Sequence, residues 1–183
     1  MDHTDHVALI KGGIPQPGGV WADFGSGNGA FTLALADILG PGSQIYSVDK
    51  NGASLNQQAR AMQSRFPAVK MHYLTADYTY SLDLPAMDGV VMANTLHFQR
   101  DKDPVLGLIQ SYLQPWGRLI VVEYNLDRGN TWVPYPFSFK KWQSIARRNG
   151  FKNTRLLARR PSRFMGEIYS AISVLGPSVQ EQS

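Results

Sequence analysis

The chain has 183 residues, of which 43% are hydrophobic and 17% charged, and this length suits one domain built around a continuous core. No apolar run approaches the roughly 18 to 20 residues of a membrane helix and the amino terminus lacks a signal-peptide pattern, so we expect a soluble, cytoplasmic protein. With no cysteine and a formal net charge of +4, the composition excludes disulfides, thiolate metal ligands and cysteine nucleophiles and gives little support for a polyanionic partner.

The first half of the chain alternates short β-rich runs with longer runs of helical period. These patterns predict strands over 19–24, 44–49 and 70–75, and helices over 28–39 and 52–66. Turn residues at 40–42 end the first helix, and Pro67 follows the second. We expect residues 1–18 to form a short N-terminal segment of the same domain.

The second half continues this alternation up to a pair of closing strands. It predicts strands over 87–93, 118–124, 152–158 and 167–174, and helices over 104–113 and 138–149. The connection 159–163 is short enough for a hairpin, so the last strand should be antiparallel. The whole pattern predicts an α/β, Rossmann-like doubly wound sheet of seven strands, mostly parallel, with helices on both faces. We expect a single domain over 1–183 with a frayed tail over 176–183.

A glycine-rich turn separates the first predicted strand from its helix. It reads Asp23-Phe24-Gly25-Ser26-Gly27-Asn28-Gly29. Glycines let the backbone turn sharply and bring its N–H groups and a helix N-terminus close to a ligand. Asp49 ends the second strand, where a carboxylate suits ribose hydroxyls. The turn therefore predicts a nucleoside cofactor, but it also fits the looser dinucleotide pattern ending at Ala30, which leaves the cofactor open.

Motif order and spacing from Val20 to Val174 resemble the class I S-adenosylmethionine-dependent methyltransferases, particularly the small bacterial enzymes that methylate small molecules. The resemblance rests on Asp23-x-Gly25-x-Gly27-x-Gly29, Asp49, Ala76-Asp77-Tyr78, the run from Asp88 to His97, Leu113-x-Pro115-x-Gly117 with the run to Glu123, and Asn149-Gly150-Phe151. It implies that S-adenosyl-L-methionine is the cofactor.

The resemblance also implies a cofactor site. Its residues would be Asp23, Gly25, Gly27, Gly29, Asp49, Lys50, Asp77, Tyr78, Asn94 and Leu96. Asp23 would orient the ammonium group or the loop, and Asp49 would accept the ribose hydroxyls. Asp77 would accept a hydrogen bond from the adenine amino group. Asn94 and Leu96 would act through their backbone at the carboxyl edge of the sheet.

Candidate acceptor-site residues follow the fourth and fifth strands. His97 is a candidate general base because imidazole titrates near neutral pH, and a histidine that is merely hydrogen-bonded is the alternative. Trp132, Tyr135 and Phe137 make the loop 125–137 aromatic, which would wall a planar or apolar acceptor. Packing of this loop against the next helix is the alternative. We expect no metal site.

The sequence predicts methyl transfer to a small-molecule acceptor by in-line displacement. An RNA or protein methyltransferase and a non-catalytic cofactor-binding partner subunit remain alternatives, with an NAD(P)-dependent oxidoreductase as a more distant one. The basic stretch from Arg147 to Arg163 is interpreted as a solvated face, because no aromatic-interleaved RNA signature accompanies it. A second subunit, as in a homodimer, could complete the acceptor site.

Overall fold

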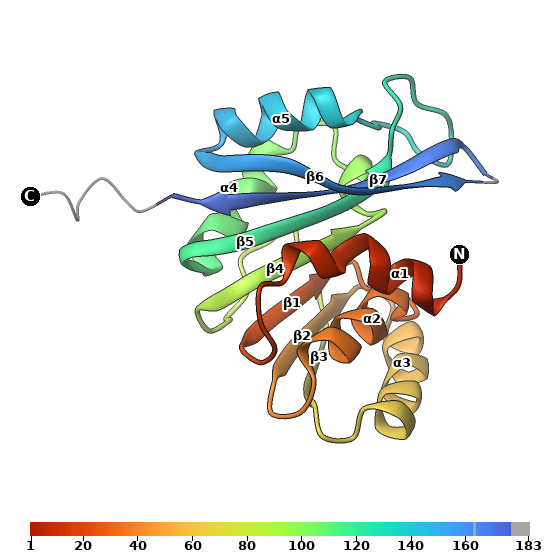
Figure 1. The fold of residues 1–183 in the computed structure, drawn as a ribbon, viewed down its shortest axis with the longest axis vertical. Helices are drawn as coiled ribbons and strands as arrows, with labels where there is room; N and C mark the ends of the chain where they lie inside the picture. Colours follow the sequence, from red (N-terminus) through yellow and green to blue (C-terminus); the bar gives the residue numbers. More distant parts are fainter. Residues whose placement is uncertain (163, 177–183) are drawn as a thin grey trace, which may run out of the picture.

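A seven-stranded sheet forms the centre of the computed structural model, which describes residues 1–162 and 164–176 (Figure 1). Its strands are β1 (Val20–Phe24), β2 (Gln44–Asp49), β3 (Lys70–Thr75), β4 (Met87–Ala93), β5 (Leu113–Tyr124), β6 (Phe151–Ser162) and β7 (Gly166–Leu175). The helices are α1 (His3–Ile10), η1 (Lys11–Gly13), α2 (Ala30–Leu39), α3 (Gly52–Arg65), η2 (Leu96–Phe98), α4 (Asp103–Tyr112) and α5 (Phe139–Arg148).

The strand order is β3-β2-β1-β4-β5-β7-β6. Strands β1 to β5 pair in parallel, whereas β7 lies antiparallel between β5 and β6. This arrangement confirms the predicted doubly wound sheet with an antiparallel last strand. The chain order reverses between β1 and β4, and the carboxyl edge at such a reversal is where open α/β sheets bind ligands.

Two apolar layers cover the sheet. One contains side chains from α4 and α5, including the fully buried Trp142, and the other contains side chains from α1, α2 and α3. Strands buried on both faces explain the continuous apolar runs in the sequence, such as Ile120–Val122 of β5.

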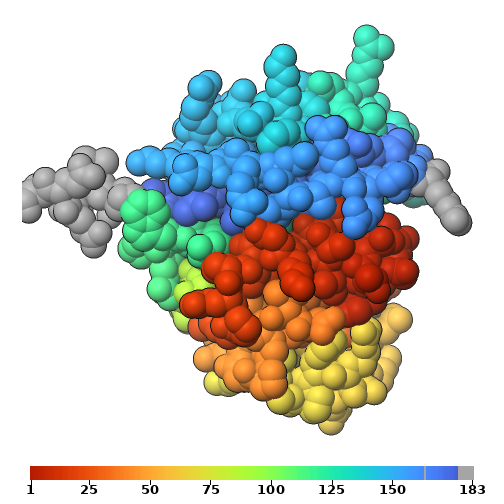
Figure 2. Space-filling view, viewed as in Figure 1, coloured from red at the N-terminus to blue at the C-terminus, as the bar shows by residue number. Residues whose placement is uncertain are grey.

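The N-terminal segment forms a helix that the sequence analysis missed. Asp2 and Asp5 make a capping box at the start of α1, and Leu9 and Ile10 are fully buried at its end. The side chain of Ser170 in β7 donates a hydrogen bond to the Leu9 carbonyl. Figure 2 shows this red segment between the blue β6–β7 region and the orange α2 region.

Two predicted boundaries differ from the structure by more than two residues. Strand β5 begins at Leu113 instead of 118, and β6 continues to Ser162, through residues expected in the hairpin connection. The reason is pairing: Ser162 is still in register with Gly166 of β7, so the ladder extends almost to the turn. Most of the tail predicted to fray, from residue 177 onwards, lies outside the described residues.

Candidate functional site

The glycine loop between β1 and α2 adopts a backbone that requires glycine. Gly25, Gly27 and Gly29 have φ values of 72°, 52° and 85°. A Cβ on Gly25 would lie 2.2 Å from Thr95 Oγ1, and one on Gly29 would lie 2.4 Å from Gln58 Cγ. The loop therefore passes too close to the end of β4 and to α3 for any larger residue at these two positions.

The amides of this loop are used differently from the prediction. Gly25 N–H donates to the Val48 carbonyl and Gly27 N–H to Asp49 Oδ2, each at 2.8 Å. Both amides are hydrogen-bonded within the protein, and they stabilise the loop. The first turn of α2 has no side-chain cap on Gly29, so the helix N-terminus remains the source of unpaired N–H groups here.

Two cavities flank the loop and share Gly25 and Asn94. The first, of about 270 Å³, is also lined by Met1, His6, Asp23, Ser26, Gly27, Asn28, Ala30, Phe31 and Ala93. The second, of about 260 Å³, is also lined by Asp49, Lys50, Tyr78, Thr95, Phe98 and Gln99. The fold thus brings most of the predicted cofactor residues to one place, at the carboxyl ends of β1, β2 and β4.

Asp23 is a buried carboxyl group at the wall of the first cavity. Its residue is 1% exposed, and its Oδ2 accepts a 2.6 Å hydrogen bond from Thr32 Oγ1. Burial raises the pKa of Asp23 to about 7, against a smaller lowering by the Thr32 bond. Thr32 in turn accepts from Gln58, whose Oε1 accepts from Ser47. This buried chain fixes the carboxyl group beneath the loop.

Asp49 and Asp77 already have partners within the chain. Asp49 accepts from the amides of Gly27 and Asn51, both at 2.8 Å. Asp77 accepts from Lys50 Nζ at 2.8 Å and from Thr79, and these bonds hold the pKa of Asp77 below its usual value although burial opposes them. Lys50 therefore contacts Asp77 directly. Asp77 does not line either cavity described above, whereas the neighbouring Tyr78 lines the second.

Asn94 occupies a strained position at the end of β4. Its φ is 52°, which is uncommon outside glycine, and its buried Oδ1 has no hydrogen-bond partner among the described residues. Next to it, Tyr78 Oη donates to the Thr95 carbonyl at 3.0 Å. This bond ties the exits of β3 and β4 together. Asn94 lines both cavities, and its Oδ1 remains an acceptor without a partner among the described residues.

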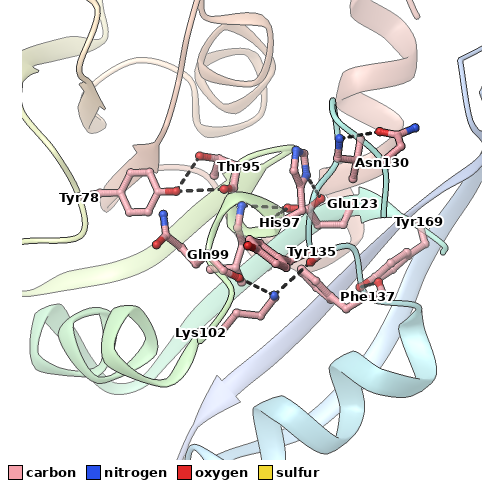
Figure 3. Close-up of polar contacts among 12 residues, drawn as sticks. Tyr78, Thr95, His97, Gln99, Lys102, Glu123, Asn130, Tyr135, Phe137 and Tyr169 are labelled. Carbon is pink, nitrogen blue, oxygen red and sulfur yellow. Dashed lines mark hydrogen bonds and ion pairs between the residues drawn. The ribbon is translucent and has the colours of Figure 1, made fainter. Parts of the chain in front are cut away.

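His97 forms a buried pair with Glu123. Its Nδ1 lies 2.6 Å from Glu123 Oε2, and the two residues are 2% and 0% exposed (Figure 3). Glu123 Oε1 accepts from the amides of Leu96 and His97 at 3.0 and 3.2 Å. The Leu96 amide is therefore occupied within the protein, and the Leu96 side chain is fully buried. Thr95 and Phe98, which flank Leu96 and His97 in the sequence, line the second cavity, whereas His97 and Glu123 line neither cavity.

The aromatic loop 125–137 lies beside His97, but its three predicted site residues differ in their exposure to solvent. Trp132 and Tyr135 are 71% and 42% exposed, and Tyr135 N–H donates to the His97 carbonyl at 3.0 Å. Phe137 is 1% exposed and packs against Trp142, so it supports the loop from the core instead of lining an open site. The prediction that Phe137 faces an acceptor is corrected by this burial.

Sequence reasoning missed several residues of this edge as site residues. Among them are Met1, His6, Lys102 and Glu123. Asp2 and Asp5 formed a recognisable capping pattern for α1, which places His6 beside the first cavity, whereas only the tertiary pairing of β4 with β5 brings Glu123 to His97. Within the described residues, no group of three His, Cys, Asp or Glu could hold a metal, and no helix is long and apolar enough to cross a membrane.

Comparisons with known proteins add to this geometry. A family model described as a methyltransferase domain matches residues 16–158. The chain is 30% identical over 125 residues to the ubiquinone/menaquinone biosynthesis C-methyltransferase UbiE of Saccharophagus degradans. The matched segment covers 67% of this chain and 49% of that protein. The chain spans less than half the length of this and other curated relatives that it matches.

Solved structures share the fold. Phosphoethanolamine N-methyltransferase 2 of Haemonchus contortus, solved with S-adenosyl-L-methionine, superposes with a TM-score of 0.74 at 15% identity and covers 96% of this chain and 53% of that one. The carbon methyltransferase CurJ gives a TM-score of 0.70 at 15% identity, covering 92% and 51%. At 15% identity, these similarities show a shared fold alone.

Proposed function

This chain belongs to the methyltransferase-domain family, and on that premise we propose that it transfers a methyl group from S-adenosyl-L-methionine to a small-molecule acceptor. The observation that carries the proposal is the pair of cavities meeting at Gly25 and Asn94, with Asp23 beside one and Asp49 beside the other. A nucleoside joined to a charged amino-acid chain needs two such compartments side by side.

The residues at the loop fit this cofactor. Within the part of the chain that the structure describes, Asn94 Oδ1 is a buried acceptor without a partner, and a cationic ammonium group would supply the missing donor. Asp23 lies on the same cavity, where a cation would favour its ionised form. The uncapped start of α2 suits a carboxylate. Asp49 Oδ1 and Oδ2 each accept one amide bond and retain a lone pair for ribose hydroxyls.

When bound, the cofactor would supply a methyl group on a sulfonium sulfur, and its thioether would be the leaving group as the acceptor attacks the methyl carbon in line. The chain contributes binding, orientation and exclusion of water. Tyr78 and Phe98 present aromatic surface in the second cavity, where a planar base can pack. Gly25 lines both compartments, and its lack of a side chain lets the loop pass close to Thr95 at their boundary.

We propose that His97 is the general base for the acceptor, with Glu123 as the residue that orients it. Glu123 already accepts two backbone amides, so its other oxygen is an acceptor for an Nδ1–H of His97. That hydrogen bond leaves the lone pair on Nε2, which is the atom that would take a proton. Trp132 and Tyr135 would bind the apolar part of the acceptor.

A base of this kind is needed only where the acceptor must lose a proton. Carbon acids and hydroxyl groups meet that condition. One sequence relative of this chain is named as a C-methyltransferase, and this name favours a carbon acceptor. The acceptor proposed here is therefore a small, apolar molecule with an acidic C–H or O–H group.

Calorimetric titration with S-adenosylhomocysteine tests the proposal, with NADH as the control ligand. We expect micromolar binding of the first alone, and loss of binding in Asp49→Ala. Asp83→Ala is the matched control, because Asp83 is an exposed acid on the 76–86 loop away from both cavities. Binding of NADH alone would overturn the cofactor assignment.

Radiolabelled methyl transfer to a panel of 1,3-dicarbonyls, hydroquinones and primary amines then tests the acceptor class. We expect incorporation with the first two groups, which offer a carbon or an oxygen acid, and none with the amines. Transfer to amines alone would contradict the acceptor class proposed here. Cofactor binding without incorporation into any member would favour the non-catalytic alternative.

A further inference from the structure

Lys102 is a buried cation that the proposed chemistry does not use. Among the described residues it is the one buried lysine or arginine, at 6% exposed. No carboxylate of the described residues lies within ion-pair distance of its Nζ. Burying an ammonium group is costly unless it is fully hydrogen-bonded, so its placement needs an explanation.

The Lys102 ammonium group joins two segments that are far apart in the sequence. Its Nζ donates to the Gln99 carbonyl at 2.8 Å and to the Tyr135 carbonyl at 3.2 Å, and lies 4.8 Å from the centroid of the Phe137 ring (Figure 3). Gln99 follows the turn that carries His97, and Tyr135 belongs to the aromatic loop. The lysine thus bridges the proposed base and the proposed acceptor wall.

Other contacts fix the same junction from both sides. Tyr135 N–H donates to the His97 carbonyl, and Tyr169 Oη donates to the Phe137 carbonyl at 3.1 Å. Burial lowers the pKa of Lys102, while Glu123 and Asp101 act in the opposite direction. The ammonium group is held by carbonyl dipoles and an aromatic face.

We propose that Lys102 is a positioning residue that holds the aromatic loop against the His97 turn, and so sets the distance between the acceptor wall and the base. The role given to this contact rests on the proposed function, whereas the contact itself does not. An apolar side chain of similar length fills the same space but cannot bind two carbonyls. The side chain at this position must therefore donate hydrogen bonds as well as fill the space.

Hydrogen exchange of the Tyr135 amide tests the proposal in Lys102→Met and Lys102→Arg. We expect exchange at least about tenfold faster in the methionine variant, because two charge-assisted hydrogen bonds that hold the loop are lost. The arginine variant, which keeps the charge and the donors, should restore most of the protection. Amides of the glycine loop and the affinity for S-adenosylhomocysteine should stay within about twofold of the wild type.

Lys141→Met is the matched control. Lys141 pairs with Asp127 of the same loop at 3.2 Å, but both side chains are about half exposed, so its loss should leave the Tyr135 amide unchanged. Should Lys102→Met fail to fold, Lys102→Gln provides two neutral donors in its place and should show intermediate exchange.

Exchange at Tyr135 within about twofold of the wild type in a folded Lys102→Met would overturn the proposal, and so would an arginine variant that exchanges like the methionine one. Failure of the wild type to bind S-adenosylhomocysteine would instead overturn the proposed function and leave the exchange result standing. The two failures are therefore distinguishable.

Discussion

His97 and Glu123 lie on consecutive strand exits, 26 residues apart, and meet through a 2.6 Å contact between Nδ1 and Oε2. The carboxylate also accepts the amides of Leu96 and His97, so one side chain orients both the ring and the backbone of the turn. Neither residue is exposed enough to exchange this contact for water.

Glu123→Gln should show whether Glu123 orients His97 for catalysis or only stabilises the fold. Glutamine keeps the shape and one acceptor oxygen, but it cannot accept both the amides and the imidazole as a carboxylate does. We expect a loss of methyl transfer of roughly 10² to 10³-fold with cofactor binding unchanged. Single-turnover assays and calorimetry would measure the two quantities. A variant with full activity would show that the pair serves the fold alone.

Asp23→Asn should change how stability depends on pH. The pKa of Asp23 is raised from an ordinary value of 3.8 to about 7, so between these pH values the native state keeps a proton that the unfolded state has lost. The free energy of unfolding of the wild type therefore falls as pH rises from about 4 to about 7, by up to roughly 4 kcal/mol from this group. Asparagine removes that decline.

Urea unfolding at pH 5 and pH 8 measures this difference. Asp23→Asn should gain stability over the wild type on going from pH 5 to pH 8, yet bind S-adenosylhomocysteine more weakly. Asp83→Asn, an exposed acid, should follow the wild type at both pH values. Parallel stability curves for Asp23→Asn and the wild type would show that the buried group does not titrate in this range.

Asn94→Gly should weaken cofactor binding without lowering the stability of the protein. Glycine relieves the φ of 52° and removes a buried acceptor that has no partner, so stability should stay within about 1 kcal/mol of the wild type or rise. Affinity for S-adenosylhomocysteine should fall about tenfold, because a hydrogen bond to its ammonium group is lost. Thermal melts with and without this ligand test both expectations. Unchanged affinity would exclude a direct contact.

Gly25→Ala and Gly27→Ala form a matched pair in the glycine loop. Both glycines have positive φ, but a Cβ meets Thr95 at 2.2 Å only at Gly25 and open space at Gly27. We expect Gly27→Ala to cost about 1 kcal/mol of stability and Gly25→Ala at least twice that. Chemical denaturation would rank them, and equal losses would mean that backbone strain outweighs the contact.

Trp132→Ala and Phe137→Ala should separate the open face of the aromatic loop from its buried face. Phe137 is 1% exposed, so its truncation should cost about 3 to 5 kcal/mol of stability. Trp132 is 71% exposed, so its truncation should leave stability within about 0.5 kcal/mol and raise the KM for an apolar acceptor. A large loss of stability in Trp132→Ala would place that side chain in the core.

Local sequence signals predicted the fold class, the antiparallel last strand of a doubly wound sheet, and the place of the glycine loop. These follow from local chemistry: β-rich runs alternating with helical periods, glycines where the backbone turns, and Asp49 one strand further on. Each of these signals is made by a few neighbouring residues, so it can be recognised in the sequence alone.

Which polar groups already have partners within the protein is apparent only once the chain is folded. The amides of Gly25 and Gly27 are used by β2, Asp77 is paired with Lys50, and Phe137 is turned into the core. Lys102 and Glu123 gained their partners through contacts across 33 and 26 residues. A single sequence does not report such long-range pairings, because they depend on which strands and loops are packed together and on burial, which raises the free-energy cost of every unpaired polar group.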